Sequence, residues 1–589
     1  MPWTSALKLQ DSGSPEGAGV SATHSRLADL LSPLWTFWSG GWLRGYGWIA
    51  AVGAVLLTSA LTAAASPIHA RLYGHDIFFL LDNGWRALHG QRVHLDYSSA
   101  WGPLTFLLIA GGLAVSGASV AAVSYTNALV ALATGLWSLW LAAARSRSVS
   151  VIAYPWFIAL LVAAPFALGD PPLYTSHGMV YNRYGYALLA IIMIECFQPT
   201  AESQSSSRTL IEPVLTGCAA SLLLFLKVTY FMVALLFVAA SLLFWNRRKV
   251  RVAGFAMGFA ALTLIFLAYL RFDVGAMVSD LRTAAAARSG SLGSRHEFAS
   301  LAEAVRPAVL LGILAFGCAR ISAASKNGAP RWQVGRYCLT ALAVVAADCM
   351  LGLTNAQLST YPLAAIFALV LMFSVEPALL SSAPPASRNE AALLVAVAGL
   401  LAGPFAFQQL AGLANGLVEA RTNSNPAGVL RFESPRLRPL ILYDVPATDI
   451  DHYSNGREYV ASVNDGMRLL AANTSPKDKV ATLDMFNPFA YALDREPIRG
   501  GIAAAAYRYT LDDTHHPSPA RFFGDAAVVM VPKYPASPPI FFDGYQKIYQ
   551  PAIEREFRLE AESARWKLYR RGTQQGPYPA LALDHRGVD

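Results

Sequence analysis

Apolar stretches of about 20 residues recur along the chain between residues 43 and 410. A bilayer core is about 30 Å thick, and a helix that rises about 1.5 Å per residue needs about 20 apolar residues to cross it. The composition agrees, because 54% of the 589 residues are hydrophobic and only 14% are charged, whereas soluble domains carry about 25% charged residues. We therefore predict a polytopic α-helical membrane protein embedded in a lipid bilayer.

Eleven stretches are predicted to span the membrane, and the basic residues between them set the orientation. The predicted spans are 43–66, 119–143, 150–168, 184–197, 211–226, 228–244, 252–270, 307–319, 337–353, 361–377 and 391–410. Basic residues of membrane proteins gather in cytoplasmic loops, and "NRRKVR" at 246–251 has four basic residues and no acidic one. The basic segments at 144–148 and 319–336 agree with it. The N-terminus is then cytoplasmic, and the residues after 410 lie outside.

One further apolar segment, "WGPLTFLLIAGGLAVSG" at 101–117, does not fit this alternation. If it were a span, the basic segment at 144–148 would lie outside. It is shorter than about 18 residues and contains Gly-Gly, which is typical of a re-entrant or interfacial piece. We predict a short helix at the outer face. The alternative, one long tilted span over 211–244, would bury Lys227 in mid-membrane at high cost.

The chain divides into three predicted regions. They are a flexible cytoplasmic tail at 1–42, a membrane module at 43–410 with outer loops at 67–118, 169–183 and 271–306, and an extracytoplasmic region at 411–589. In the last region, β-type runs such as "KVATLD" and "AAVVMVP" alternate with helical stretches, which predicts a soluble α/β domain. A hairpin at 557–571 would close its sheet. We interpret "LDDTHHPSP" at 511–519 as a polar surface loop and not as a metal cluster.

Charge and cysteine content argue against two other kinds of function. The net charge of +8 is explained by basic cytoplasmic loops, and no stripe of basic and aromatic residues indicates nucleic-acid binding. The five cysteines lie in or beside apolar segments and lack metal-ligand spacing. We therefore expect them to be inert thiols.

The first outer loop, "GHDIFFLLDNGWRALHGQRVHLDYSSAWGPL" from Gly74 to Leu104, combines a His-Asp pair with an amphipathic stretch. One helical face carries Ile77, Leu81, Trp85 and Leu88, and away from it lie Asp82, Asn83 and Arg86. We predict an interfacial helix that lies on the lipid and ends near Gly90. Asp76 stands at its N-terminus, where it either caps the helix or faces a cavity at the outer membrane boundary.

The order of these features resembles a known family. A first span, an outer loop that opens with His75 and Asp76, an amphipathic helix and a Y-x-x-x-x-G-P-L segment from Tyr97 are similar to the GT-C superfamily of polyprenyl-phosphate-dependent glycosyltransferases. These include the protein mannosyltransferases, the aminoarabinose transferases of lipid A and the oligosaccharyltransferase catalytic subunits. The resemblance covers the membrane module and, more loosely, the region after it. It implies that Asp76, with His75 beside it, is the catalytic base or holds a divalent metal.

The resemblance also implies roles for polar residues of the other outer loops. In the second loop it brings His177, Tyr181, Asn182 and Arg183 to the substrate. Arg183 would bind a lipid-linked phosphate through two hydrogen bonds, whereas Asn182 replaces an acid of the family and weakens the case for a metal. Further candidates are Asp96, Lys227, Arg288 and Arg295 for substrate binding, and His296 and Glu297 for a metal. For Arg183 and Lys227 the alternative is a side chain that extends to the membrane interface.

The chemistry implied is sugar transfer at the outer face of a bacterial inner membrane. A polyprenyl-phosphate donor loses its phosphate, an acceptor hydroxyl on a glycan, lipid or protein attacks with inversion, and Asp76 takes the hydroxyl proton. Two other classes stay open: a multispan transporter or flippase, and a non-catalytic assembly protein for envelope polysaccharide. A transporter should have paired interrupted helices and mid-membrane charges, but the candidate charges here cluster at the outer boundary.

Overall fold

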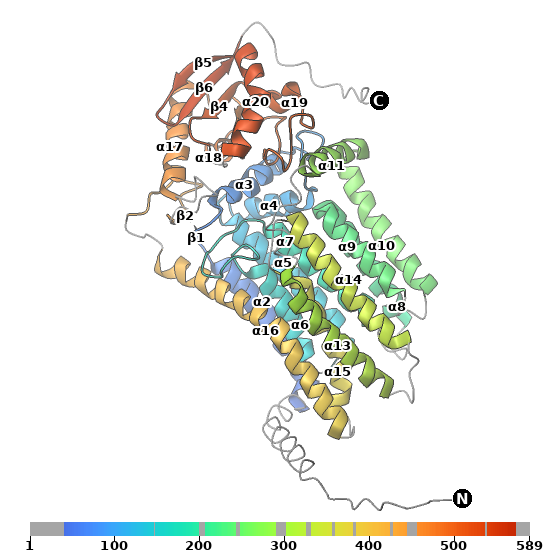
Figure 1. The fold of residues 1–589 in the computed structure, drawn as a ribbon. Coiled ribbons are helices and arrows are strands. Elements are labelled where there is room, and N and C mark those ends of the chain that lie inside the picture. The colour runs from blue at the N-terminus through green and yellow to red at the C-terminus, as the bar shows by residue number, and fades with distance from the viewer. Residues whose placement is uncertain are drawn as a thin grey trace, which may run out of the picture.

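The computed structural model describes residues 41–146, 148–198, 206–242, 248–289, 302–324, 332–355, 360–380, 385–423, 428–444, 456–535 and 539–572. Residues 1–40 of the predicted tail lie outside this set, and so do the candidate site residues Arg295, His296 and Glu297. The described chain forms a bundle of long helices with a smaller region of helices and strands at one end (Figure 1).

Each predicted span overlaps a helix of the bundle. The helices are α2 (Gly41–Ala64), α5 (Ala122–Ala143), α6 (Ser150–Ala163), α7 (Val180–Phe197), α8 (Ser206–Leu226), α9 (Val228–Ser241), α10 (Arg248–Tyr269), α13 (Val305–Ala324), α14 (Trp332–Asn355), α15 (Pro362–Leu380) and α16 (Pro385–Thr422). Eight helices in the described ranges are long and apolar enough to cross a membrane, all of these except α6, α7 and α9. The chain is therefore an integral membrane protein, and the total of eleven spans stays a prediction.

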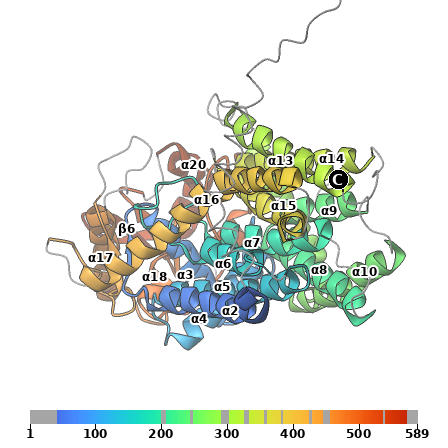
Figure 2. The same ribbon diagram turned by 90° about the horizontal axis from the view of Figure 1, so that it is seen from below.

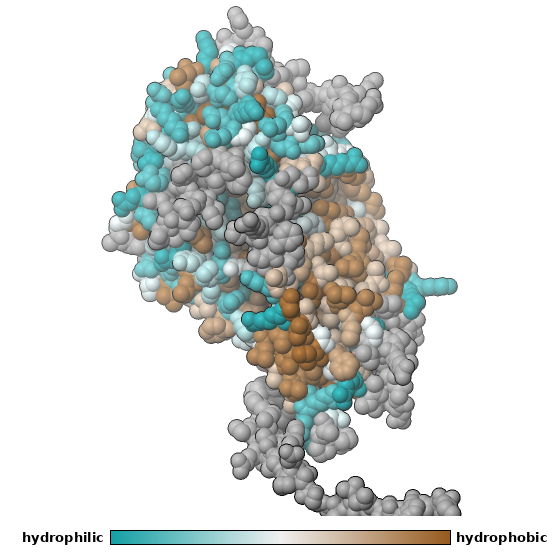
Figure 3. Space-filling model, in the orientation of Figure 1, coloured by the Kyte–Doolittle hydropathy of each residue, from teal (hydrophilic) through white to brown (hydrophobic). Residues whose placement is uncertain are grey.

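The surface of the molecule agrees with this division. Figure 3 shows apolar residues concentrated along the helix bundle and hydrophilic residues over the end that carries the C-terminal region. Seen from below, the helices of the bundle lie side by side across the molecule (Figure 2). Within the bundle, α8 and α10 are in close contact. A Cβ on Gly217 would lie only 2.1 Å from the Phe255 carbonyl oxygen. Small residues allow this approach of two backbones in a membrane protein.

Two shorter helices lie at the end of the bundle that the C-terminal region covers. They are α3 (Gly74–Leu88) and α4 (Leu104–Val115). With 12 residues, α4 cannot cross about 30 Å of hydrocarbon, so a short helix within 101–117 is confirmed. Its re-entrant or interfacial position stays a prediction.

The prediction that α3 lies on the lipid is wrong. Ile77 and Leu81 are both fully buried, because α4 packs against this helix. The C-terminal region covers residues of both faces. On the polar face, Asn83 Nδ2 donates to the Ala503 carbonyl over 3.1 Å, and on the apolar face, Trp85 Nε1 donates to the Arg495 carbonyl over 2.9 Å. A helical wheel shows two faces, but it does not show that protein covers both of them.

A buried ion pair strengthens this contact. Asp82 accepts from Arg86 Nε over 3.0 Å, one helical turn away. Arg86 also donates to the Ile498 and Gly500 carbonyl oxygens, each over 3.0 Å. Burial raises the pKa of Asp82, although Arg86 lowers it. Asp82 is therefore a structural carboxylate.

The C-terminal region contains a small sheet. Strands β3 (Val480–Thr482), β4 (Val528–Pro532), β6 (Trp566–Arg571) and β5 (Phe557–Glu562) lie in that order, with β3 and β4 parallel and the other pairs antiparallel. The hairpin predicted at 557–571 is confirmed as β5 and β6. The region also includes α17 (Gly456–Asn473), α18 (Phe489–Ala492), α19 (Pro519–Phe523) and α20 (Pro539–Glu556).

The predicted boundary after residue 410 falls inside a helix. α16 continues to Thr422, where Glu419 accepts from Arg71 Nε over 2.8 Å and from Thr175 Oγ1 over 2.7 Å. Strand β1 (Ile68–Ala70), just after the first span, pairs in parallel with β2 (Leu440–Leu442). A short sheet thus joins the segment after α2 to the region after the bundle.

Candidate functional site

Asp76 lies in the first turn of α3. The helix begins at Gly74, and its N-cap residue is Tyr73, in the left-handed region with φ 50° and ψ 39°. Asp76 is therefore not the N-cap, although a carboxylate in the first turn is still stabilised by the helix dipole. Its side chain is 18% exposed, with Oδ1 lying 3.5 Å from the His75 Nε2 atom.

The second outer loop approaches the Asp76 carboxylate through Gly178. A Cβ on Gly178 would lie 2.8 Å from Asp76 Oδ2 and 3.2 Å from the Tyr73 Cβ. The Gly178 N–H donates to Ser176 Oγ over 3.0 Å, which fixes the loop. A side chain at this position would displace the Asp76 carboxylate, so the glycine lets the second outer loop lie directly against Asp76.

Lys227 is the single residue between α8 and α9. Its backbone is extended, with φ −164° and ψ 123°, and Nζ donates to Asn355 Oδ1. Asn355 Nδ2 in turn donates to the Tyr230 hydroxyl over 3.0 Å, and Lys227 Nζ lies 5.3 Å from the ring centre of Tyr181. Burial and the nearby Arg288 lower the pKa of Lys227 to about 7.

Arg288 brings a second cation to this place. It lies in the last turn of α11 (Val274–Ser289) and donates through Nη2 to the Leu353 carbonyl over 3.1 Å. Its guanidinium carbon lies 4.8 Å from the ring centre of Tyr509 in the C-terminal region. Because Arg288 disfavours the charged form of Lys227, an anion placed near both of them would relieve their repulsion.

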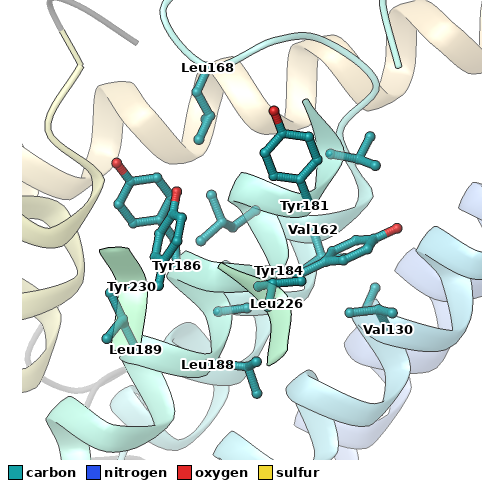
Figure 4. Packing of buried hydrophobic residues seen from close by; sticks show 14 of the residues in the cluster. Val130, Val162, Leu168, Tyr181, Tyr184, Tyr186, Leu188, Leu189, Leu226 and Tyr230 are labelled. Carbon is teal, nitrogen blue, oxygen red and sulfur yellow. The ribbon is translucent and has the colours of Figure 1, made fainter. Parts of the chain in front are cut away.

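Tyr181 connects the carboxylate with the cations. Burial raises the pKa of Tyr181, the Asp76 carboxylate raises it further, and Arg288 lowers it. Figure 4 shows the hydroxyl groups of Tyr181, Tyr186 and Tyr230 pointing to one side of the view, whereas Tyr184 points towards α5. We call Asp76, Tyr181, Lys227 and Arg288 the outer polar cluster, and its members come from four separate segments.

The "WGPL" segment packs against the helix break at Lys227. The Gly102 N–H donates to the Leu226 carbonyl over 3.2 Å, and a Cβ on Gly102 would lie only 2.1 Å from the Phe225 carbonyl oxygen. The Trp101 ring then lies with its centre 5.8 Å from that of Tyr181. The glycine of this motif is therefore explained by close packing of the loop on the last turn of α8.

The C-terminal region contributes side chains that the sequence analysis missed. The Phe486 ring stacks on His75 with centres 5.8 Å apart and an interplanar angle of 18°, and Tyr509 lies against Arg288. Both are more than 200 residues from their partners along the chain. No local sequence pattern could have identified these two residues. Gly178, in contrast, is a single glycine just before the polar first turn of α7, which could have suggested that another segment packs closely there.

Arg183 does not have the role that the resemblance implied. Its guanidinium is 2% exposed and donates to the Phe166 carbonyl over 3.0 Å, to the Leu161 carbonyl over 2.6 Å and to Gln409 Oε1 over 2.6 Å. The residue satisfies carbonyl groups at the end of α6, so its N–H groups are occupied by protein. These contacts argue against Arg183 as a phosphate ligand.

Asp96 has a local role as well. Its Oδ2 accepts from the backbone N–H of Arg92 over 2.7 Å, and its role in substrate binding stays a prediction.

Asn182 and His177 are buried with polar atoms that lack partners among the described residues. Asn182 is fully buried, and neither its Oδ1 nor its Nδ2 atom has a hydrogen-bond partner among the described residues. The Nδ1 atom of His177 likewise has no hydrogen-bond partner among them. Burial, then His69 and Arg183, lower the pKa of His177 to about 4, so it is neutral at pH 7. An unpaired buried polar group costs about 1–3 kcal/mol, so a ligand that paired with these atoms would recover part of this cost.

A metal site is not built from the described residues. Within them, no group of three or more His, Cys, Asp or Glu side chains is placed to hold an ion. Of the suggested ligands, Asp76 belongs to the outer polar cluster, while His296 and Glu297 lie outside the described ranges.

Comparison with known proteins gives one likeness. No family model matches the chain, and no curated protein matches it. A solved structure that it resembles is that of ArnT from Cupriavidus metallidurans in the apo state, at 14% identity, with 89% of this chain and 98% of that chain covered and a TM-score of 0.37. A likeness of this strength carries no argument about function, which must come from the residues of the site.

Proposed function

We propose that the protein is a membrane glycosyltransferase of GT-C type. It moves a sugar from a polyprenyl-phosphate donor to an acceptor hydroxyl at the outer face of a bacterial inner membrane. The N-terminus is cytoplasmic and the C-terminal region lies outside. The acceptor is a glycan, lipid or protein, and the reaction inverts the anomeric centre.

The observation that carries this proposal is the outer polar cluster. The Asp76 carboxylate raises the pKa of Tyr181, and Arg288 lowers it. The Lys227 ammonium lies 5.3 Å from the ring centre of Tyr181, and Arg288 lowers the pKa of Lys227. This combination suits a reaction in which a proton is removed from one group while negative charge develops on another. The cluster lies where the helix bundle meets the C-terminal region, which contributes Tyr509 beside Arg288.

In the proposed mechanism, Asp76 accepts the proton of the acceptor hydroxyl as its oxygen attacks the anomeric carbon. The bond from that carbon to the phosphate oxygen breaks, and the electron pair leaves with the polyprenyl phosphate. Lys227 and Arg288 stabilise this leaving phosphate. A positioned general base contributes about 10²–10⁴-fold in rate, and charge-assisted hydrogen bonds contribute about 1.5–3 kcal/mol each.

A transfer assay in vesicles tests the proposal and separates it from the two alternatives. The full chain is reconstituted, radiolabelled polyprenyl-phosphate sugars are added, and incorporation of label into membrane acceptors is compared with Asp76→Ala. We expect incorporation by the wild type and at least a 100-fold loss in the variant, as removal of a general base predicts. Movement of intact donor across the bilayer without transfer would indicate a flippase. No effect of the protein on label would indicate a non-catalytic assembly protein.

A further inference from the structure

A polar pocket lies between α11, the loop before "WGPL" and the C-terminal region. It has a volume of about 110 Å³, whereas a cavity that holds one water needs about 10–15 Å³ on this measure. Most of its lining is polar: Ser99, Ser279, Asp280, Thr283, His516 and Arg521 contribute. We call it the α11 pocket. Its size fits a small polar group such as one sugar ring.

The walls of the α11 pocket are held in place by charged groups. Asp280 Oδ2 lies 2.9 Å from His94 Nδ1 and accepts from the Ser99 N–H over 3.0 Å. Arg521 donates through Nε to Ser98 Oγ over 3.0 Å and through Nη2 to the His94 carbonyl over 2.8 Å. Its Nη2 also lies 3.7 Å from Asp280 Oδ1. These contacts hold both groups in fixed positions, and the Asp280 carboxylate, with about four lone-pair sites, can accept further hydrogen bonds from a ligand.

The α11 pocket adjoins the outer polar cluster. Ala100 and Thr510 line the pocket, and their chain neighbours Trp101 and Tyr509 pack on Tyr181 and Arg288. Because consecutive Cα atoms are about 3.8 Å apart, the pocket and the cluster are linked through adjacent residues on two separate segments. A ligand in the pocket therefore lies next to the segments that pack on Tyr181 and Arg288.

We infer that the α11 pocket binds a sugar ring of the acceptor, so that the acceptor is a glycan or a glycolipid. This inference rests on the proposed function. A polyprenyl chain would need apolar walls, but the pocket offers hydroxyl, carboxylate, imidazole and guanidinium groups, which pair with sugar hydroxyls. The lipid-linked donor then approaches from the membrane, and the acceptor approaches from the aqueous side.

The test uses a substitution in the pocket and a matched control on the same helix. Thr283→Leu narrows the pocket and removes a hydroxyl from its wall, whereas Ala285→Leu places the same leucine side chain at an exposed position of α11 that does not line the pocket. The purified full chain is given a panel of radiolabelled polyprenyl-phosphate sugars, with and without a glycolipid extract from native membranes. Two rates are measured: transfer of label to the extract and release of free sugar to water.

We expect Thr283→Leu to lower the ratio of transfer to hydrolysis at least about tenfold, as loss of about 1.4 kcal/mol of acceptor binding predicts. Ala285→Leu should leave both rates as in the wild type. A ratio within twofold of the wild type in Thr283→Leu, or an equal fall in both variants, overturns the assignment of the pocket. If the wild type neither transfers nor hydrolyses any donor, the proposed function itself fails, and the inference fails with it.

Discussion

At the scale of single residues, Lys227 shows how the fold prepares a charge for a ligand. It interrupts two apolar helices with one extended residue, and its ammonium group lies beside Asn355 and Tyr181. Its folded pKa of about 7 is below the ordinary value of 10.5, mainly because of burial. A bound phosphate would favour the charged form again.

This gives a prediction about pH. Lys227 is protonated below pH 7 and loses its proton as pH rises through about 7. Donor affinity should therefore be highest below pH 7, and the donor KM should rise towards tenfold per pH unit at higher pH. In Lys227→Arg the donor KM should change little with pH, because arginine stays charged over this range. The measurement is the donor KM from about pH 6 to pH 9, and equal slopes for wild type and variant would contradict the role of Lys227.

Arg183 leads to a different expectation from the one its sequence position suggests. Because its N–H groups satisfy buried carbonyl oxygens, Arg183→Ala should destabilise the protein by about 3 kcal/mol or more. The KM values for donor and acceptor should change together. Thermal unfolding and both KM values check this. Normal stability combined with a raised donor KM alone would restore Arg183 as a phosphate ligand.

At the scale of elements, the sequence predicted the helices well and their surroundings poorly. A span is a local property, because apolar length alone decides whether a helix can cross the bilayer, and each predicted span overlaps a helix. The cover of α3 is not local: Asn83 and Ala503 are 420 residues apart. Asp76 could be named as a candidate site residue because its place just after the first span is a local feature. Phe486 could not be named, because its contact with His75 joins distant parts of the chain.

The contact of "WGPL" with α8 can be tested with two glycines. Gly102→Ala places a methyl group 2.1 Å from the Phe225 carbonyl oxygen, so the loop must move, at a cost of about 1–3 kcal/mol. Gly111→Ala in α4 has nothing within 4 Å and should be neutral or stabilise the protein by up to about 1 kcal/mol. Thermal unfolding of the two variants measures the difference. Equal midpoints would show that the close contact is absent in solution.

At the scale of the whole molecule, the outer loops and the C-terminal region belong to one end. Thr175 Oγ1 donates to Glu419 over 2.7 Å, and the Ser98 N–H donates to the Gly501 carbonyl over 3.1 Å. These bonds join the first outer loop, the second outer loop and the chain after the bundle. All three must therefore lie on the same side of the membrane.

Reporter fusions test this arrangement. A reporter that is active only outside the cytoplasm should be active when fused after residue 100, 175 or 420, and inactive when fused after 147 or 249. The basic segments near the last two positions are expected to stay in the cytoplasm. A cytoplasmic signal at 175 would contradict the predicted topology and would separate Asp76 from the second outer loop.

The central claim is that Asp76 is the base of a sugar transfer, and Asp76→Asn tests it most directly. Asparagine keeps the size and the polar oxygen of the side chain but cannot take a proton from a hydroxyl at neutral pH. Transfer of a radiolabelled sugar and binding of the donor are measured together, with Asp494→Asn, an exposed carboxylate, as the control. We predict that Asp76→Asn folds and binds donor normally while turnover falls about 10²–10⁴-fold, and that the control is unchanged. A variant that keeps most of its turnover would contradict the account.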